Sequence, residues 1–256
     1  DAPARHTFRK VSMPIIDQKE QARIDLAAAF RWAARMNFHE GVCNHFSLAI
    51  PGETDRFLIN PHGLHFSEIR ASDLCTLDAE GNAHGGYHPP EPTAFYIHSA
   101  IHRTNPKAAC VLHTHMPYAT ALCLVQEGRL EMVSQNALRY LDQVAYDDKY
   151  NGLVLDFDEG FRIAEVLGDK RVLFLANHGV IVVGPTVADA FDDLYYLERA
   201  CQHQVLAMST GRPLKPIDPQ VAAMTCEQIE GERLNAQLHF QALKRILERE
   251  APEYAD

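Results

Sequence analysis

The sequence predicts an α/β fold in which one mixed sheet is flanked by helices. Short apolar stretches alternate with longer amphipathic stretches along the whole chain, so strands and helices are interspersed rather than segregated. The chain has 256 residues, 46% of them hydrophobic, which is enough for one large domain with a substantial core. No repeat or linker divides it. We therefore expect a single domain over residues 1–256, with an N-terminal tail at 1–16 and a C-terminal helical segment at 213–256.

The first part of the chain predicts one helix followed by short strands. Residues 19–36 carry an apolar stripe, including Ile24 and Trp32, with the spacing of an amphipathic helix. A Pro-Gly turn at 51–55 and an Asp-rich turn at 78–82 separate apolar runs. The strands predicted here span residues 46–50, 57–60 and 74–77. Ser67 is predicted to cap a short helix at 68–72.

The second part predicts alternating helices and strands. Pro117 suits the first turn of a helix, Gly168 suits a helix end, and Asp189 stands three residues after the predicted cap Thr186. The predicted helices span residues 93–104, 118–124, 159–167, 186–208 and 227–250. The predicted strands are residues 109–113 and a pair within 172–183 that is interrupted at 177–179.

Charge and cysteine usage exclude several functional classes. The chain has 24 Lys and Arg against 34 Asp and Glu, a net charge of −10, which disfavours binding to nucleic acid. No apolar run approaches the length of a membrane span, and the N-terminal residues have no apolar signal core. The six cysteines form no Cys-x-x-Cys pair. We expect a cytoplasmic protein that contacts neither nucleic acid nor membrane.

Three histidines stand where apolar strands end. An apolar run at residues 109–112 leads into His113 and His115, and side chains two positions apart in a strand point to the same face. A second apolar run leads into His178. Three imidazoles with an open position are the ligand set of a catalytic metal site. With fourteen histidines, close pairs also arise by chance, but ligands in α/β proteins gather at strand ends, which favours the metal site.

Five motifs, in order along the chain, resemble the class II aldolase/adducin family. They are residues 41–47 (GVCNHFS), 59–63 (INPHG), 97–102 (IHSAIH), 111–121 (VLHTHMPYATA) and 177–184 (NHGVIVVG). The resemblance runs from about residue 21 to residue 208. It implies a three-layer α/β/α sandwich with a central mixed, largely antiparallel sheet, usually tetrameric, with the metal site near a subunit interface. It also implies that His113, His115 and His178 bind a divalent ion, most often zinc, with manganese and iron as alternatives.

The chain departs from the family's sugar-phosphate aldolases at two places. Their acid/base glutamate lies four residues before the histidine that matches His98, and here that position is Ala94; the nearest carboxylate is Glu91. The phosphate-binding residues are only partly kept. The corresponding substrate-binding candidates are Asn44, His62, which replaces a threonine, Gly63, and Thr93, which with Pro92 replaces two serines.

We therefore expect a metal-dependent carbon–carbon lyase that decarboxylates or cleaves a small non-phosphorylated hydroxy acid, with aromatic acids as one candidate class. A hydroxyl and a neighbouring oxygen of the substrate would chelate the ion, and a nearby acid would protonate the carbanion. The candidate acids are His62, His98, Glu91 and Tyr118. Three of them have a structural alternative: His62 in a polar surface loop, His98 packed beneath the site, and Glu91 as a charge at a helix N-terminus.

Other functions stay open from the sequence. The same residues could cleave a sugar phosphate in a retro-aldol reaction. Iron at this site could activate oxygen, although most such sites use two histidines and a carboxylate. The chain could also be a non-catalytic, adducin-like assembly module. A scaffold has no physical need for three imidazoles at strand ends, which argues against that alternative.

Overall fold

The computed structural model describes residues 17–53 and 55–256, so the predicted tail at 1–16 lies outside the described residues. The helices are α1 (Gln18–Arg35), α2 (Pro92–Thr104), α3 (Pro117–Cys123), α4 (Gln135–Leu138), α5 (Phe157–Leu167), α6 (Val187–Met208), α7 (Pro219–Gly231) and α8 (Leu234–Glu250), with 3-10 turns η1 (Ala71–Asp73) and η2 (Pro252–Ala255). The strands are β1 (His45–Ala49), β2 (Phe57–Ile59), β3 (Cys75–Leu77), β4 (Ala83–His84), β5 (Cys110–Thr114), β6 (Val144–Asp147), β7 (Val172–Leu175) and β8 (Gly179–Gly184). The predicted mixture of helices and strands is confirmed.

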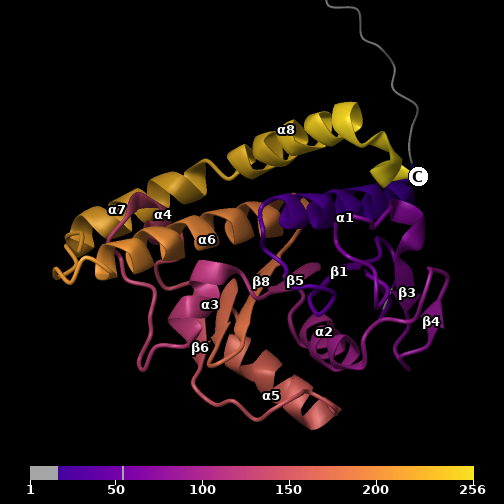
Figure 1. Ribbon diagram of the computed structural model, residues 1–256, viewed down its shortest axis with the longest axis horizontal. Coiled ribbons are helices and arrows are strands. Elements are labelled where there is room, and N and C mark those ends of the chain that lie inside the picture. Colours follow the sequence, from indigo (N-terminus) through magenta and orange to yellow (C-terminus); the bar gives the residue numbers. More distant parts are fainter. Residues whose placement is uncertain (1–16, 54) are drawn as a thin grey trace, which may run out of the picture.

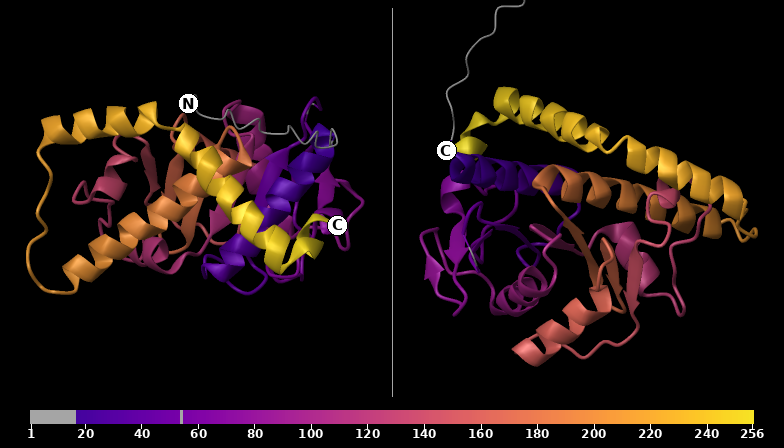
Figure 2. Two further views of the ribbon diagram at one scale, coloured as in Figure 1. Left: turned by 90° about the horizontal axis from the view of Figure 1, so that it is seen from above. Right: turned by 180° about the vertical axis from the view of Figure 1, so that it is seen from behind.

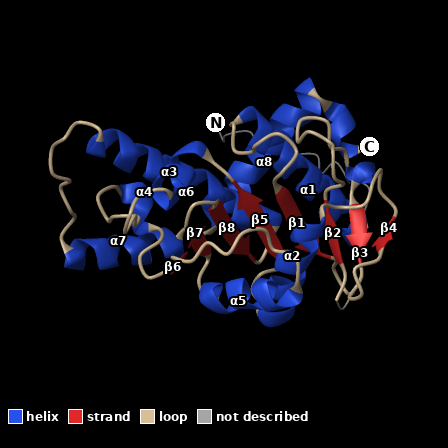
Figure 3. Ribbon diagram, turned by 60° about the horizontal axis from the view of Figure 1, so that its bottom comes forward, coloured by secondary structure: helices blue, strands red, loops and turns tan. Residues whose placement is uncertain are grey.

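One sheet contains all the described strands, in the order β4-β3-β2-β1-β5-β8-β7-β6 (Figure 3). Within the described chain β6 and β7 pair in parallel, and the other neighbouring strands pair antiparallel. The sheet is therefore mixed and largely antiparallel, as expected. Because β5 lies between β1 and β8, side chains from three distant parts of the sequence meet at its centre.

Helices cover both faces of this sheet (Figures 1 and 2). Helices α2 and α5 lie on one face, which we call the α2 face, and α1, α3, α6 and α8 lie on the other, the α6 face. The alternation along β5 follows the pleat, with Cys110 and Leu112 in the core of the α6 face and Val111 in the core of the α2 face. This three-layer arrangement puts His113 on the α2 face.

Two predicted elements differ in the structure. The helix predicted at 68–72 is wrong, and the segment forms a turn followed by η1. The side chain of Arg31 on α1 donates to the backbone oxygens of Glu68 and Ile69, so a tertiary contact uses carbonyls that a helix would need. The single helix predicted at 227–250 is also wrong.

That C-terminal segment forms two helices, α7 and α8. The helix is interrupted at Glu232 and Arg233. There, both terminal nitrogens of the Arg233 guanidinium bind the buried carboxylate of Asp193 at 2.9 and 3.1 Å. Beyond the break, Phe240 and Leu247 of α8 pack into the core of the α6 face. None of the described helices is long and apolar enough to cross a membrane.

Candidate metal centre

The structure brings the three predicted histidine ligands together. His113 lies in β5, His115 follows it, and His178 lies in the turn between β7 and β8. The ring centroids are 5.0 Å apart for His113 and His115, and 4.8 Å apart for each of the other two pairs. One ligand nitrogen of each ring lies within 4.8 Å of the other two, so that small rotations of the rings can bring all three onto a single ion.

The turn that carries His178 depends on two local features. Asn177 adopts a left-handed backbone conformation with φ of 59°, which asparagine tolerates better than most residues. Gly179 lets the turn approach the end of β5, because a Cβ there would lie 2.5 Å from the Thr114 carbonyl oxygen and 2.8 Å from Cδ2 of His115. The Asn-His-Gly sequence therefore sets His178 directly beside His115.

Hydrogen bonds orient two of the rings for metal binding. Nδ1 of His113 donates to the carbonyl oxygen of Val180 at 3.0 Å, and Nδ1 of His115 donates to Oε2 of Glu40 at 2.6 Å. Each bond places the proton on Nδ1 and leaves a lone pair on Nε2. Nε2 of His115 is buried and has no hydrogen-bond partner among the described residues, as expected for an atom that binds an ion.

Burial favours the neutral form of His113 and His178, which is the form that binds a metal. It lowers the pKa of His113 well below its usual value, and it lowers the pKa of His178 to about 4, with further lowering from the neighbouring His115. Imidazole nitrogens suit zinc, and also iron and manganese. The residues present therefore fit a divalent ion.

A pocket of about 380 Å³ opens over the histidines. Its lining consists of Glu40, Cys43, His45, His62, Glu91, Thr93, Ile97, His113, His115, Tyr150, Gly152, Leu153, Val154 and His178. Part of this lining is titratable, and Ile97, Leu153 and Val154 make another part of it apolar. No lysine or arginine of the described chain is among these lining residues.

The remaining predicted site residues fall into two groups. Glu91, Thr93 and His62 line the pocket, and the Thr93 hydroxyl donates a hydrogen bond to Glu91. Asn44 is buried behind it, where its side-chain oxygen accepts from the backbone N–H of Glu40 at 2.7 Å and of His115 at 3.4 Å. Gly63, with φ of 89°, is exposed and outside the pocket lining.

His98 and Tyr118 do not line the pocket. His98 is fully buried and contacts His45 and Ser47 through its ring nitrogens. Tyr118 lies on α3, packs against the core of the α6 face, and donates its backbone N–H to Glu198 at 2.9 Å. Ala94, in place of the aldolase glutamate, is fully buried among apolar side chains. A direct catalytic role for His98 or Tyr118 stays a prediction that this geometry does not favour.

Sequence reasoning missed three residues at this site. His45 packs against His113 with ring centroids 4.8 Å apart, Glu40 binds His115, and the Tyr150 ring lies 6.5 Å from the His178 ring. One signal for His45 was present, because His45 and Ser47 alternate with the apolar Phe46 and Leu48 in a strand. Glu40 and Tyr150 lie in loops, where no periodicity marks them.

Comparison with known proteins agrees with this geometry. Residues 24–205 match the family model described as the class II aldolase and adducin N-terminal domain. The chain belongs to the class II aldolase/adducin family. The family match covers most of the described chain and all three histidines.

Three relatives represent the range of the family. A putative aldolase class 2 protein from Caulobacter vibrioides is 39% identical over 92% of each chain. The decarboxylase NovR of Streptomyces niveus is 31% identical over 91% of this chain and 89% of its own. Alpha-adducin of Rattus norvegicus is 36% identical over 77% of this chain, but the match spans only 27% of adducin.

Two solved structures share the whole architecture. An aldolase II superfamily protein from Pseudomonas syringae has a TM-score of 0.87 and 36% identity, covering 95% of this chain and 98% of its own. An L-fuculose 1-phosphate aldolase from Glaciozyma antarctica has a TM-score of 0.82 and 27% identity, covering 99% of this chain and 96% of its own. The expected three-layer fold of the family is thereby confirmed.

Proposed function

We propose that this protein is a divalent-metal-dependent carbon–carbon lyase that decarboxylates a non-phosphorylated hydroxy acid, with a hydroxylated aromatic acid as the favoured class. One observation carries the proposal: three imidazole nitrogens converge within 4.8 Å at a pocket that is also lined by the apolar side chains of Ile97, Leu153 and Val154. The first feature fits an ion that binds oxygen atoms of a substrate. The second fits the flat apolar face of a ring.

His113, His115 and His178 would hold the divalent ion, which would supply Lewis acidity for the charge that develops as the carbon–carbon bond breaks. Ile97 and Leu153 offer a surface against which an aromatic ring can pack. Cleavage leaves a carbanion that needs a proton. Glu91 holds that proton in our proposal, because its carboxyl lines the pocket and is fixed by the Thr93 hydroxyl; His62 is a second candidate in the lining.

The charge of the pocket supports a substrate without phosphate. A phosphate carries close to two negative charges at neutral pH and is usually bound by Arg or Lys side chains or by a helix N-terminus. The lining residues within the described chain include two glutamates and no cationic Lys or Arg, although the N-terminus of α2, with Glu91 and Thr93, also lies at the pocket. The similarity to a decarboxylase supports the same choice, whereas the similarity to an L-fuculose 1-phosphate aldolase keeps retro-aldol cleavage as the second candidate.

We further propose a cytoplasmic homotetramer. All six cysteines are free thiols, which suits a reducing compartment. Tyr150, Leu153 and Leu155 are more than half exposed at and beside the mouth of the pocket, and a neighbouring subunit would cover them. Light scattering measures the molecular mass of the protein and of a Leu153→Asp/Leu155→Asp variant in solution. An unchanged mass in the variant would show that these residues do not lie in the interface.

One experiment tests the proposed activity. Protein purified without added metal is analysed for bound ions, then incubated with a panel of hydroxybenzoic acids for carbon dioxide release and with sugar phosphates for aldehyde release. We expect about one ion per chain and carbon dioxide release, both lost in the His113→Ala/His115→Ala variant and kept in His203→Ala, an exposed histidine on α6. Aldehyde release alone would favour the aldolase.

A non-catalytic role is the remaining candidate, and the similarity to alpha-adducin supports it. An assembly module predicts that the double histidine variant keeps both its metal content and its stability. The lyase predicts loss of the ion. Metal analysis and thermal unfolding of the same two samples therefore separate the two functions, even before a substrate is known.

A further inference from the structure

A row of polar side chains runs between β1 and α2, away from the metal centre. His45 and Ser47 alternate along β1 and face α2, where His98 and His102 lie one helical turn apart. Nδ1 of His45 lies 2.7 Å from Nε2 of His98, the other ring nitrogen of His98 contacts the Ser47 hydroxyl, and that hydroxyl lies 2.7 Å from Nε2 of His102. Nδ1 of His102 lies 2.9 Å from the carbonyl oxygen of Ala108.

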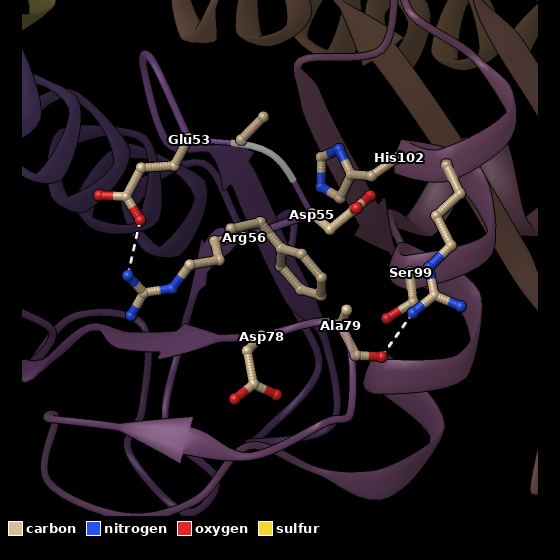
Figure 4. Close-up of a pocket in the computed structure, with 10 residues that line it drawn as sticks. Glu53, Asp55, Arg56, Asp78, Ala79, Ser99 and His102 are labelled. Atoms are coloured by element: carbon tan, nitrogen blue, oxygen red, sulfur yellow. Dashed lines mark hydrogen bonds and ion pairs between the residues drawn. The ribbon is translucent and has the colours of Figure 1, made fainter.

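The two ends of this row reach different pockets. His45 lines the pocket over the metal centre. His102 lines a second pocket of about 280 Å³, together with Asp55, Arg56 and Ser99 (Figure 4). The row is therefore a continuous hydrogen-bonded connection from the metal pocket to a separate cavity.

The protons in this row have one consistent arrangement when all three imidazoles are neutral. A carbonyl oxygen only accepts, so Nδ1 of His102 carries the proton and its Nε2 accepts from the Ser47 hydroxyl. Having donated its only proton, Ser47 accepts from Nδ1 of His98. Nε2 of His98 is then bare and accepts from Nδ1 of His45.

Burial favours the neutral forms of the two histidines on α2. It lowers the pKa of His98 well below its usual value, with His102 adding to the effect. It lowers the pKa of His102 to about 4. At neutral pH the Ala108 carbonyl thus determines, through four hydrogen bonds, which nitrogen of His45 is protonated.

We propose that His45 is a substrate-contacting residue whose bare Nε2 accepts a hydrogen bond from a hydroxyl group of the molecule bound at the metal centre. Ser47, His98 and His102 are positioning residues that hold His45 in this tautomer. Nδ1 is occupied by His98, so Nε2 is the polar atom that the ring offers to the pocket, and no described residue binds it. This inference deepens the proposed function and rests on it.

A fixed acceptor of this kind discriminates against substrates that lack the hydroxyl. A ligand without a donor would bury Nε2 unpaired, and sites built to bind a hydroxyl reject analogues without one. A freely rotating or mixed-tautomer histidine would accept from one ligand and donate to another, with little preference. The row of side chains therefore gives the pocket its selectivity for hydroxylated molecules.

The tautomer is tested first, without reference to activity. Protein labelled with ¹⁵N-histidine and loaded with zinc is studied by long-range ¹H–¹⁵N correlation spectra, which distinguish a protonated Nδ1 from a protonated Nε2. The His45 signals are assigned as those lost in His45→Gln. We expect His45 protonated on Nδ1 in the native protein and a mixture of tautomers in Ser47→Ala. A native Nε2–H form, or an unchanged tautomer in Ser47→Ala, overturns the inference.

Ligand selectivity is tested second. The three monohydroxybenzoates and benzoate are titrated into zinc-loaded native protein, His45→Leu and His203→Leu. We expect at least one hydroxybenzoate to bind more tightly than benzoate, and this ratio to fall about threefold to tenfold in His45→Leu, the range expected for one neutral hydrogen bond, but not in His203→Leu. Ser47→Ala should lower the ratio in the same direction.

The outcomes separate this inference from the proposed function. If native protein binds no zinc, the proposed function fails at the metal centre. If zinc binds and the preference for hydroxybenzoates is the same in native protein and His45→Leu, the metal centre stands and the role of His45 is refuted. Should His45→Leu not fold, Ser47→Ala and the native spectra decide the question, because Ser47 lies outside the pocket lining.

Discussion

Oε2 of Glu40 lies 2.6 Å from Nδ1 of His115, although the two residues are 75 positions apart in the sequence. The bond holds the ring of His115 so that Nε2 points toward His113 and His178. A carboxylate behind a metal-bound histidine also raises the basicity of the ligand nitrogen. The loop that carries Glu40 thus takes part in the metal centre without touching the ion.

Substitution Glu40→Ala should therefore weaken metal binding about tenfold or more, the usual cost of losing such a partner. Glu40→Gln, which keeps an oxygen acceptor but no charge, should fall between native protein and Glu40→Ala. Competition with a chromophoric chelator measures the zinc affinity. Glu165→Gln, an exposed carboxylate on α5, is the matched control. Equal zinc affinities in all four proteins would show that Glu40 does not contribute to metal binding.

The turn at Gly179 allows a second prediction. A Cβ at this position would meet the Thr114 carbonyl oxygen at 2.5 Å, so Gly179→Ala must push the turn away from β5 and move His178 relative to His115. We expect a loss of stability of at least about 1–3 kcal/mol, as for other overpacked sites, and weaker zinc binding. Urea unfolding and chelator competition give the two values.

Gly231→Ala is the control for that change. Nothing lies within 4 Å of a Cβ there, and the residue ends α7, so alanine should leave zinc binding intact and change stability by less than about 1 kcal/mol. If both glycine variants behave alike, the close approach at Gly179 is not what holds the histidines together.

Strand periodicity was enough to predict the pair His113 and His115, because both the apolar run and the spacing are local. The proximity of His178 required the pairing of β5 with β8, for which the sequence offered only the general rule that ligands gather at strand ends and the resemblance to a family. The row from His45 to His102 shows the same limit. Its alternation in β1 and its helical spacing in α2 are each visible in the sequence, but the contact between the two elements is tertiary.

The C-terminal helix was mispredicted for a related reason. No proline separates α7 from α8, and the break is stabilised by the pairing of Arg233 with a buried aspartate on α6. Gly231, just before the break, was the one local indication of a helix end. A distant ion pair overrides helical propensity here, and a pattern of apolar residues carries no information about it.

Acid should destabilise the metal-free protein. Histidine titrates near pH 6.5 in an unfolded chain, whereas burial lowers the pKa of His98 well below that and of His178 to about 4. Below pH 6.5 the unfolded chain therefore binds more protons than the folded one, and the free energy of unfolding falls as the pH drops toward 4. Urea unfolding between pH 7.5 and 4.5 measures the slope.

Replacing one buried histidine should reduce that slope. His98→Gln removes one group that binds protons only after unfolding, so its stability should fall less steeply with acid than that of native protein. His203→Gln, at an exposed position, should follow the native curve. An identical slope in all three would mean that His98 is not held neutral by the fold.

Glu198 provides the opposite pH dependence. Its carboxylate is buried under α3, where its two oxygens accept the backbone N–H groups of Tyr118 and Ala119 at 2.9 Å each. Burial raises the pKa to about 7 from a usual 4.5, although the two backbone bonds favour the charged form. Between pH 4.5 and 7 the folded protein therefore binds more protons than the unfolded chain, and this group lowers the free energy of unfolding as the pH rises through that window.

The glutamine in Glu198→Gln cannot ionise, so the variant should lack the pH dependence of stability that Glu198 contributes. The free energy of unfolding of the variant minus that of native protein should increase from pH 4.5 to about 7 and stay constant above it, because the histidine contributions are common to both proteins and cancel. Urea unfolding of the metal-free proteins at pH 4.5, 6, 7 and 8 gives the difference, with Glu165→Gln as control. A difference that is flat with pH would show that Glu198 titrates at its ordinary pKa, so that the backbone N–H groups at the start of α3 balance the effect of burial. A difference that falls would show a pKa below the ordinary value, so that these N–H groups stabilise the charge more than burial opposes it.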